Sequence, residues 1–151
     1  MNWELDITID EPFEEEISED WLRGVVGEVM AAEAVDYPAA LSLFITGDEK
    51  VQELNRDYRE IDQTTDVLAF AFQEEPDFPP SPDNAVQLGE VIISWPQASR
   101  QSEEQGHSIS FEMAVLTIHG VLHLLGYNHE NDEEEQLMKT RETEILANLT
   151  G

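Results

Sequence analysis

The chain has 151 residues, with 34 acidic and only 7 basic side chains, and its formal net charge is -27 at pH 7. Such a surface repels polyanions and argues against nucleic-acid binding through a broad basic patch. The chain has no cysteine, which excludes disulfides, thiolate chemistry and zinc sites with sulfur ligands, so any metal must be held by histidine or carboxylate.

The length suits one domain, and we expect residues 1–151 to form it. No apolar stretch approaches the roughly 18 residues that a membrane span needs. The first ten residues, MNWELDITID, lack the basic and apolar regions of a secretion signal. We therefore expect a soluble, cytoplasmic protein without a membrane partner.

Hydrophobic periodicity predicts an α+β fold, with about four strands in one mixed sheet and helices packed against it. The strands are expected at residues 3–9, 41–45, 66–72 and 86–94. Helices are expected after Ser18, from about residue 48, after Ser94, from about residue 110, and from within the acidic run 130–135. The segment EEPDFPPSPDN, 74–84, has four prolines and is predicted to be an extended, mobile loop.

The predicted helix from about 110 to 125 is apolar on most sides, which is typical of a helix buried in the core. Gly126 is expected to end it, because glycine accepts the left-handed conformation found at helix ends. The acids of residues 130–135 suit the first turn of the last helix, and this role accounts for them better than metal binding does. His107, isolated before the buried helix, is expected to be an ordinary core residue with its hydrogen bonds satisfied.

Residues 119–129, HGVLHLLGYNH, hold three of the four histidines. His119 and His123 are four apart on the predicted helix and share one face, and the chain reversal at Gly126 can return His129 toward the same point. Three neutral nitrogen donors without an evident fourth protein ligand predict a zinc-type site with an open position, at the end of the buried helix. A closed structural site, with Asp132 or a nearby glutamate as fourth ligand, is the alternative.

An open zinc position can activate a water molecule or polarise a phosphoryl or carbonyl oxygen. Zinc peptidases carry H-E-x-x-H, whose glutamate is the general base. Gly120 takes the place of that glutamate here, which disfavours peptide hydrolysis and is expected to open space beside the metal, although Glu112 could in principle act as the base. Phosphodiester cleavage needs a fixed cation for the phosphate, which arginine supplies well, and the chain offers Arg23, Arg56, Arg59, Arg100 and Arg141.

Three blocks of the sequence together resemble the YbeY family. HGVLHLLGYNH resembles its H-G-x-L-H-L-x-G-Y-D-H signature, and NRDYREIDQTTDVLAF, 55–70, resembles its N-x-x-Y-R and T-D-V-L-S-F motifs. LGEVIIS, 88–94, is similar to its G-D-I-x-I-S strand. The blocks keep the family order and span most of the chain.

This resemblance implies an α+β fold with the metal in a cleft, and a zinc-dependent, single-strand-specific endoribonuclease. Its expected role is maturation of the 3′ end of 16S rRNA and ribosome quality control. His119, His123 and His129 would be the ligands of one zinc ion, and Arg59 would be the catalytic or phosphate-binding residue. The expected partners are single-stranded RNA and the ribosome or its proteins, and not DNA.

The chain departs from the family pattern at three positions. Asn128 stands where an aspartate is usual, so a carboxylate that would orient a ligand is missing and metal affinity is expected to fall. Ala69 and Ala71 replace serine and proline, with an expected effect on packing.

Several alternatives stay open at this point. Arg59 is either a functional residue or a surface arginine paired with an acid, and Asp66 either orients Arg59 or simply begins a strand. Because the net charge suits RNA poorly, RNA would need a local cationic cleft built from the metal, Arg59 and Arg56, or presentation by the ribosome. The other function classes are a zinc peptidase and a non-enzymatic, metal-stabilised module for ribosome assembly.

Overall fold

The computed structural model describes residues 3–72, 86–127 and 130–150. The predicted mobile loop, 74–84, lies outside these residues, and so do Asn128 and His129. Within the described ranges, no helix combines the length and the apolar character needed to cross a bilayer.

In the described part of the chain, four strands form one mixed sheet, as the sequence predicts. They are β1 (Trp3–Ile9), β2 (Ala39–Thr46), β3 (Val67–Ala71) and β4 (Val86–Ser94), in the order β1-β2-β4-β3. β2 pairs in parallel with both β1 and β4, whereas β3 is antiparallel to β4. Within the described sheet β3 is therefore an edge strand, and its first residue, Val67, lines the cavity described below.

The helices also begin close to the predicted positions. They are α1 (Glu19–Ala32), α2 (Asp48–Arg59), α3 (Trp95–Gln105), α4 (Ile109–Leu124) and α5 (Asp132–Thr150), and a short 3₁₀ helix, η1 (Glu11–Phe13), was not predicted. Side-chain caps explain the starts of α1 and α3: the Ser18 hydroxyl accepts the Trp21 N–H, and the Ser94 hydroxyl accepts the Gln97 N–H. Gly126 follows α4 with a φ of 108°, as expected of a glycine that ends a helix.

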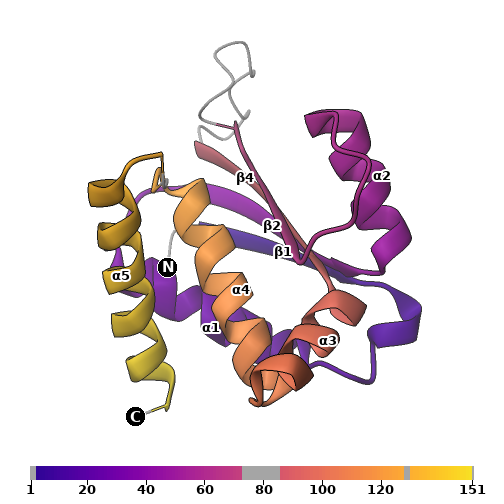
Figure 1. Cartoon of the computed structure of the whole chain (residues 1–151). Helices are drawn as coiled ribbons and strands as arrows, with labels where there is room; N and C mark the ends of the chain where they lie inside the picture. The colour runs from indigo at the N-terminus through magenta and orange to yellow at the C-terminus, as the bar shows by residue number, and fades with distance from the viewer. Residues whose placement is uncertain (1–2, 73–85, 128–129, 151) are drawn as a thin grey trace.

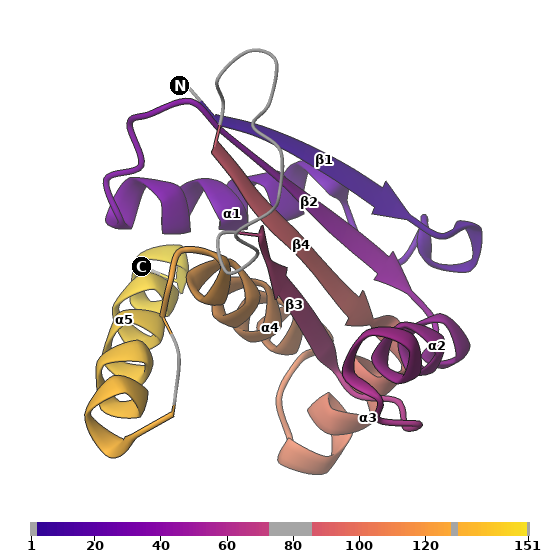
Figure 2. The same ribbon diagram turned by 90° about the horizontal axis from the view of Figure 1, so that it is seen from above.

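Helices cover both faces of the sheet. α1 and α4 lie on one face and α2 on the other, while α5 packs beside α1 and α4 (Figures 1 and 2). The main core fills the space between the sheet and the layer of α1, α4 and α5. A smaller core, Val51, Leu68 and Ile92, lies under α2.

Gly120 marks the closest approach of α4 to the sheet. A Cβ atom at this position would lie 2.5 Å from Cγ1 of Val91 on β4. The expectation that Gly120 opens space beside a metal is therefore wrong: this glycine is buried against β4, and its missing side chain lets the helix reach the sheet.

Asp48 joins three elements at the start of α2. Its carboxylate accepts hydrogen bonds from Ser94 Oγ at 2.7 Å, from Arg100 Nη2 at 2.8 Å and from Thr64 Oγ1 at 3.3 Å. Burial of the carboxyl raises its pKa, but the bonds from Ser94 and Arg100 and the Arg100 charge outweigh that effect, so the pKa lies below the usual 3.8.

We expect Asp48→Asn to destabilise the protein in a pH-dependent way. A carboxyl whose pKa is lowered by folding adds stability above its unfolded pKa and loses it as the pH falls through the lower folded pKa. The gap in unfolding free energy between wild type and variant should therefore be full at pH 6 and shrink below about pH 3.8. Urea titrations across this range measure it, with the exposed Asp57→Asn as control; a gap independent of pH would contradict the assignment.

Candidate metal centre

His119 and His123 lie one turn apart near the end of α4. The residues between and beside them, Ile118, Gly120, Val121, Leu122 and Leu124, are buried, whereas both histidines are only partly buried. The core contacts therefore fix the rotation of α4 about its axis, and the i, i+4 spacing puts both imidazoles on the side that the core does not cover. His129, the third predicted ligand, lies outside the described residues.

A carboxylate on α5 contacts the first of these histidines. Nδ1 of His119 and Oε1 of Glu142 are 2.6 Å apart. A neutral imidazole that donates Nδ1–H carries its lone pair on Nε2, and such carboxylate–histidine pairs are typical of metal ligands. We did not predict this contact from the sequence, because it joins residues 23 positions apart on different helices.

A cavity of about 430 Å³ opens beside His119. Its lining includes Asp66, Gln101, His107, Phe111, Glu112 and His119. Lysine and arginine are absent from the described residues that line it, so the cavity itself offers no fixed cation to a phosphate.

A hydrogen-bonded network rigidifies one wall of this cavity. Glu112, which is 4% exposed, lies 2.6 Å from His107 Nε2 and accepts a bond of 2.9 Å from Gln101 Nε2. The same Gln101 nitrogen donates to Asp66 at 3.1 Å. His107 is thus satisfied, as expected, but the expectation of a core position is wrong, because its side chain is partly exposed at the cavity.

Asp66 directly precedes β3. One oxygen of its carboxylate accepts the Val67 N–H at 2.7 Å, and the other accepts the bond from Gln101. Among the described contacts none joins Asp66 to Arg59. The strand-start interpretation of Asp66 is therefore the one that these contacts favour.

Arg59 is the last residue of α2 and is exposed. Its Nη2 donates to the carbonyl oxygen of Ala69 at 3.0 Å, and its guanidinium carbon lies 5.5 Å from the centre of the Phe70 ring. Neither partner is an acid, so neither neutralises the guanidinium charge. The described contacts thus give no support to the alternative of an arginine paired with a carboxylate.

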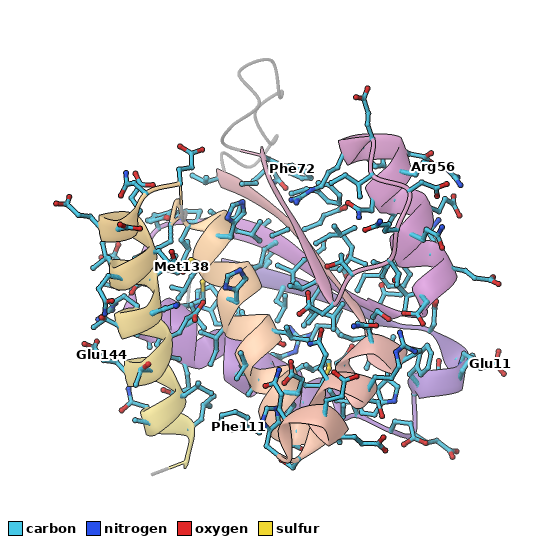
Figure 3. All side chains as sticks on the ribbon, in the orientation of Figure 1. Glu11, Arg56, Phe72, Phe111, Met138 and Glu144 are labelled. Carbon is cyan, nitrogen blue, oxygen red and sulfur yellow. The ribbon has the colours of Figure 1, made fainter. Side chains whose placement is uncertain are left out.

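The edge strand β3 separates Arg59 from the histidines. α4 packs on one side of this strand and α2 on the other (Figures 1 and 2). Arg59 is not among the residues that line the cavity at His119. Arg56, the other arginine considered for a cationic cleft, points away from α4 (Figure 3) and pairs with Asp57.

The chain is anchored directly after α4. The Tyr127 hydroxyl donates to Glu33 Oε1 at 2.7 Å, and Arg141 Nε donates to Glu33 Oε2 at 2.8 Å. Burial and the bond to Glu33 raise the pKa of the Tyr127 hydroxyl. The chain after α1 and the chain after α4 are thereby joined to each other and to α5.

Known proteins match this chain over almost its whole length. A family model described as Endoribonuclease YbeY matches residues 5–150. The chain belongs to the YbeY endoribonuclease family. This confirms the resemblance seen in its three sequence blocks.

Relatives named Endoribonuclease YbeY support the assignment. One from Dehalococcoides mccartyi (strain CBDB1) is 44% identical, and the alignment covers 97% of this chain and 93% of the relative. One from Heliobacterium modesticaldum is 47% identical, with 77% and 75% covered. The solution structure of a Thermotoga maritima protein is 21% identical in sequence and superposes with a TM-score of 0.62. The alignment covers 95% of this chain and 87% of the Thermotoga chain, which confirms the α+β fold.

Proposed function

We propose that the chain is a zinc-dependent, single-strand-specific endoribonuclease that acts in the cytoplasm. Its substrate would be the 3′ end of 16S rRNA, and ribosome quality control its wider role. Membership of the YbeY family supports cleavage of RNA. The observation that carries the metal proposal is the 2.6 Å contact between His119 Nδ1 and Glu142, on a histidine that shares its helix face with His123.

The donor set fits a zinc ion. His119, His123 and His129 would hold it through neutral imidazole nitrogens, which with carboxylates are the zinc ligands open to a chain without cysteine. Bound there, zinc would supply an activated water and a positive charge beside a phosphoryl oxygen.

Arg59 would hold the phosphate backbone of the RNA. Its planar guanidinium matches phosphate oxygens, and the bond to Ala69 O fixes its position on β3 without cancelling its charge. A single strand lying across the edge strand β3 would approach Arg59 on one side and the histidines on the other. The few cations of the chain make presentation of the RNA by the ribosome part of this proposal.

Replacing Arg59 with alanine is expected to lower RNA cleavage by about 10²- to 10³-fold, the usual cost of losing one group that stabilises charge in a transition state. Zinc affinity should not change, because Arg59 is outside the predicted ligand set. Single-turnover cleavage of a single-stranded RNA, beside a zinc titration, separates the two effects. Lys50→Ala removes one exposed charge from the same helix and is the control; equal cleavage by wild type and Arg59→Ala would overturn this role.

The same preparations test the other function classes. A peptidase would cleave unstructured peptides and leave single-stranded RNA intact. Two observations disfavour this class: Gly120 stands in the place of the peptidase general base, and Glu112, the other candidate base, already contacts His107 and Gln101. A non-enzymatic assembly module would show a fourth protein ligand on the metal and keep its biological activity in Arg59→Ala. Either result would replace the proposed nuclease.

A further inference from the structure

Glu142 lies on the apolar face of α5. Met138 precedes it by four residues and Ile145 follows it by three, and these two side chains are 2% and 0% exposed. Figure 3 shows Met138 turned toward α4 and Glu144 turned away from it. The Glu142 side chain is 18% exposed, so its carboxylate loses most of its contact with water and needs a polar partner.

That partner is a ring nitrogen of His119, and the choice of nitrogen matters. Oε1 of Glu142 meets Nδ1, the nitrogen nearer the backbone. With the proton held at Nδ1, the lone pair is on Nε2 at the outer end of the ring, and the hydrogen bond also restricts rotation about χ2. A contact that served only to join two helices would not depend on this tautomer.

Packing already joins the two helices. Met138 and Ile145 belong to the same buried core as Ile118 and Leu122 of α4. Apolar packing already holds α5 against α4. Another apolar side chain at position 142 would serve that packing as well as a partly buried carboxylate does. Its specific contribution is to the imidazole that it contacts.

We propose that Glu142 is a positioning residue for the metal centre, which holds the tautomer and the ring orientation of His119 required for zinc binding. This inference rests on the proposed function, since it concerns the same predicted zinc site. It also bears on the expected fall in metal affinity from Asn128, which replaces the usual aspartate beside the last histidine. With Glu142, α5 would supply an orienting carboxylate to a different ligand, His119.

Titration of each protein with Zn²⁺ against a chromophoric chelator tests the proposal. Glu142→Ala should weaken zinc affinity by about 10- to 100-fold, the usual cost of losing such a partner of a metal ligand. Glu142→Gln should lose less, because its amide oxygen can still accept the Nδ1–H. Glu144→Gln is the matched control, since that residue is on the same helix and its side chain is 54% exposed.

A second readout does not depend on metal. In nitrogen-15 NMR spectra of the metal-free protein at a pH where His119 is neutral, the ring should carry its proton on Nδ1 in wild type and shift toward the other tautomer in Glu142→Ala. Urea unfolding of the metal-free variants identifies any general loss of folding. The isosteric Glu142→Gln keeps the test valid if Glu142→Ala folds poorly.

The possible outcomes distinguish a failure of the positioning role of Glu142 from a failure of the proposed zinc centre. If wild type binds zinc no better than His119→Ala, the proposed zinc centre itself is wrong. If wild type binds zinc tightly and both Glu142 variants match it, the centre stands and the positioning role is wrong. Tight wild-type binding, weakened in the Glu142 variants and unchanged in Glu144→Gln, would support both.

Discussion

Replacing Gly120 with alanine is expected to destabilise the protein by about 1–3 kcal/mol, the usual cost of forcing an extra carbon into a packed core. The added methyl would lie 2.5 Å from Val91 Cγ1 and 3.0 Å from Val91 Cγ2. Valine is branched at Cβ and has few rotamers, and Val91 is fully buried, so its side chain has little room to turn away from α4. Either α4 must move off β4, carrying the two histidines with it, or the core must accept the strain.

Two further variants make this expectation specific. Val91→Ala should restore part of the stability of Gly120→Ala, because it removes the atoms in conflict, and a double-mutant cycle would show that coupling. Gly24→Ala is the control: a Cβ atom added to Gly24 of α1 would meet no neighbouring atom within 4 Å, so alanine there should stabilise the helix by up to about 1 kcal/mol. Urea unfolding measures all of these proteins. A Gly120→Ala protein as stable as wild type would mean that α4 is not held this closely.

The second large effect is expected at the histidines. His119→Ala and His123→Ala should each lower zinc affinity by more than about 100-fold, since losing even an indirect partner of a ligand costs 10- to 100-fold. RNA cleavage should fall with the metal, while the metal-free protein stays folded because neither side chain belongs to the core.

His107→Ala is the comparison for this pair of variants. His107 lines the same cavity but is outside the predicted ligand set, so its loss should change zinc affinity by no more than a few-fold. The chelator titration used for Glu142 measures all three proteins. Zinc binding that survives in both His119→Ala and His123→Ala would show that the ion is held elsewhere.

Much of the fold could be predicted from local pattern alone. Alternation of apolar residues predicted the strands, and Ser18, Ser94 and Gly126 marked helix ends through interactions that span only a few residues. The buried helix α4 was predicted because most of its circumference is apolar. The family motifs could likewise be recognised in the sequence, because they are contiguous stretches of chain.

What local pattern could not supply were the contacts between distant residues. Glu142 carries no sequence signal of its own beyond its place between Met138 and Ile145 on an apolar helix face. The hydrogen-bond acceptor of Arg59 is a backbone carbonyl, which every residue has, so no residue type could reveal it. Gly120 was interpreted through the chemistry of a missing glutamate, whereas its environment is set by Val91 across the helix–sheet interface.

The position of α5 has a consequence for the newly made chain. This helix packs on both α1 and α4, and it contributes the carboxylate that contacts His119. A nascent polypeptide that ends before Asp132 would contain the residues of the sheet and of the histidine helix, but it would lack the Glu142 carboxylate and the core side chains Met138 and Ile145. Translation must therefore pass through α5 before the core is closed and His119 can gain its carboxylate partner.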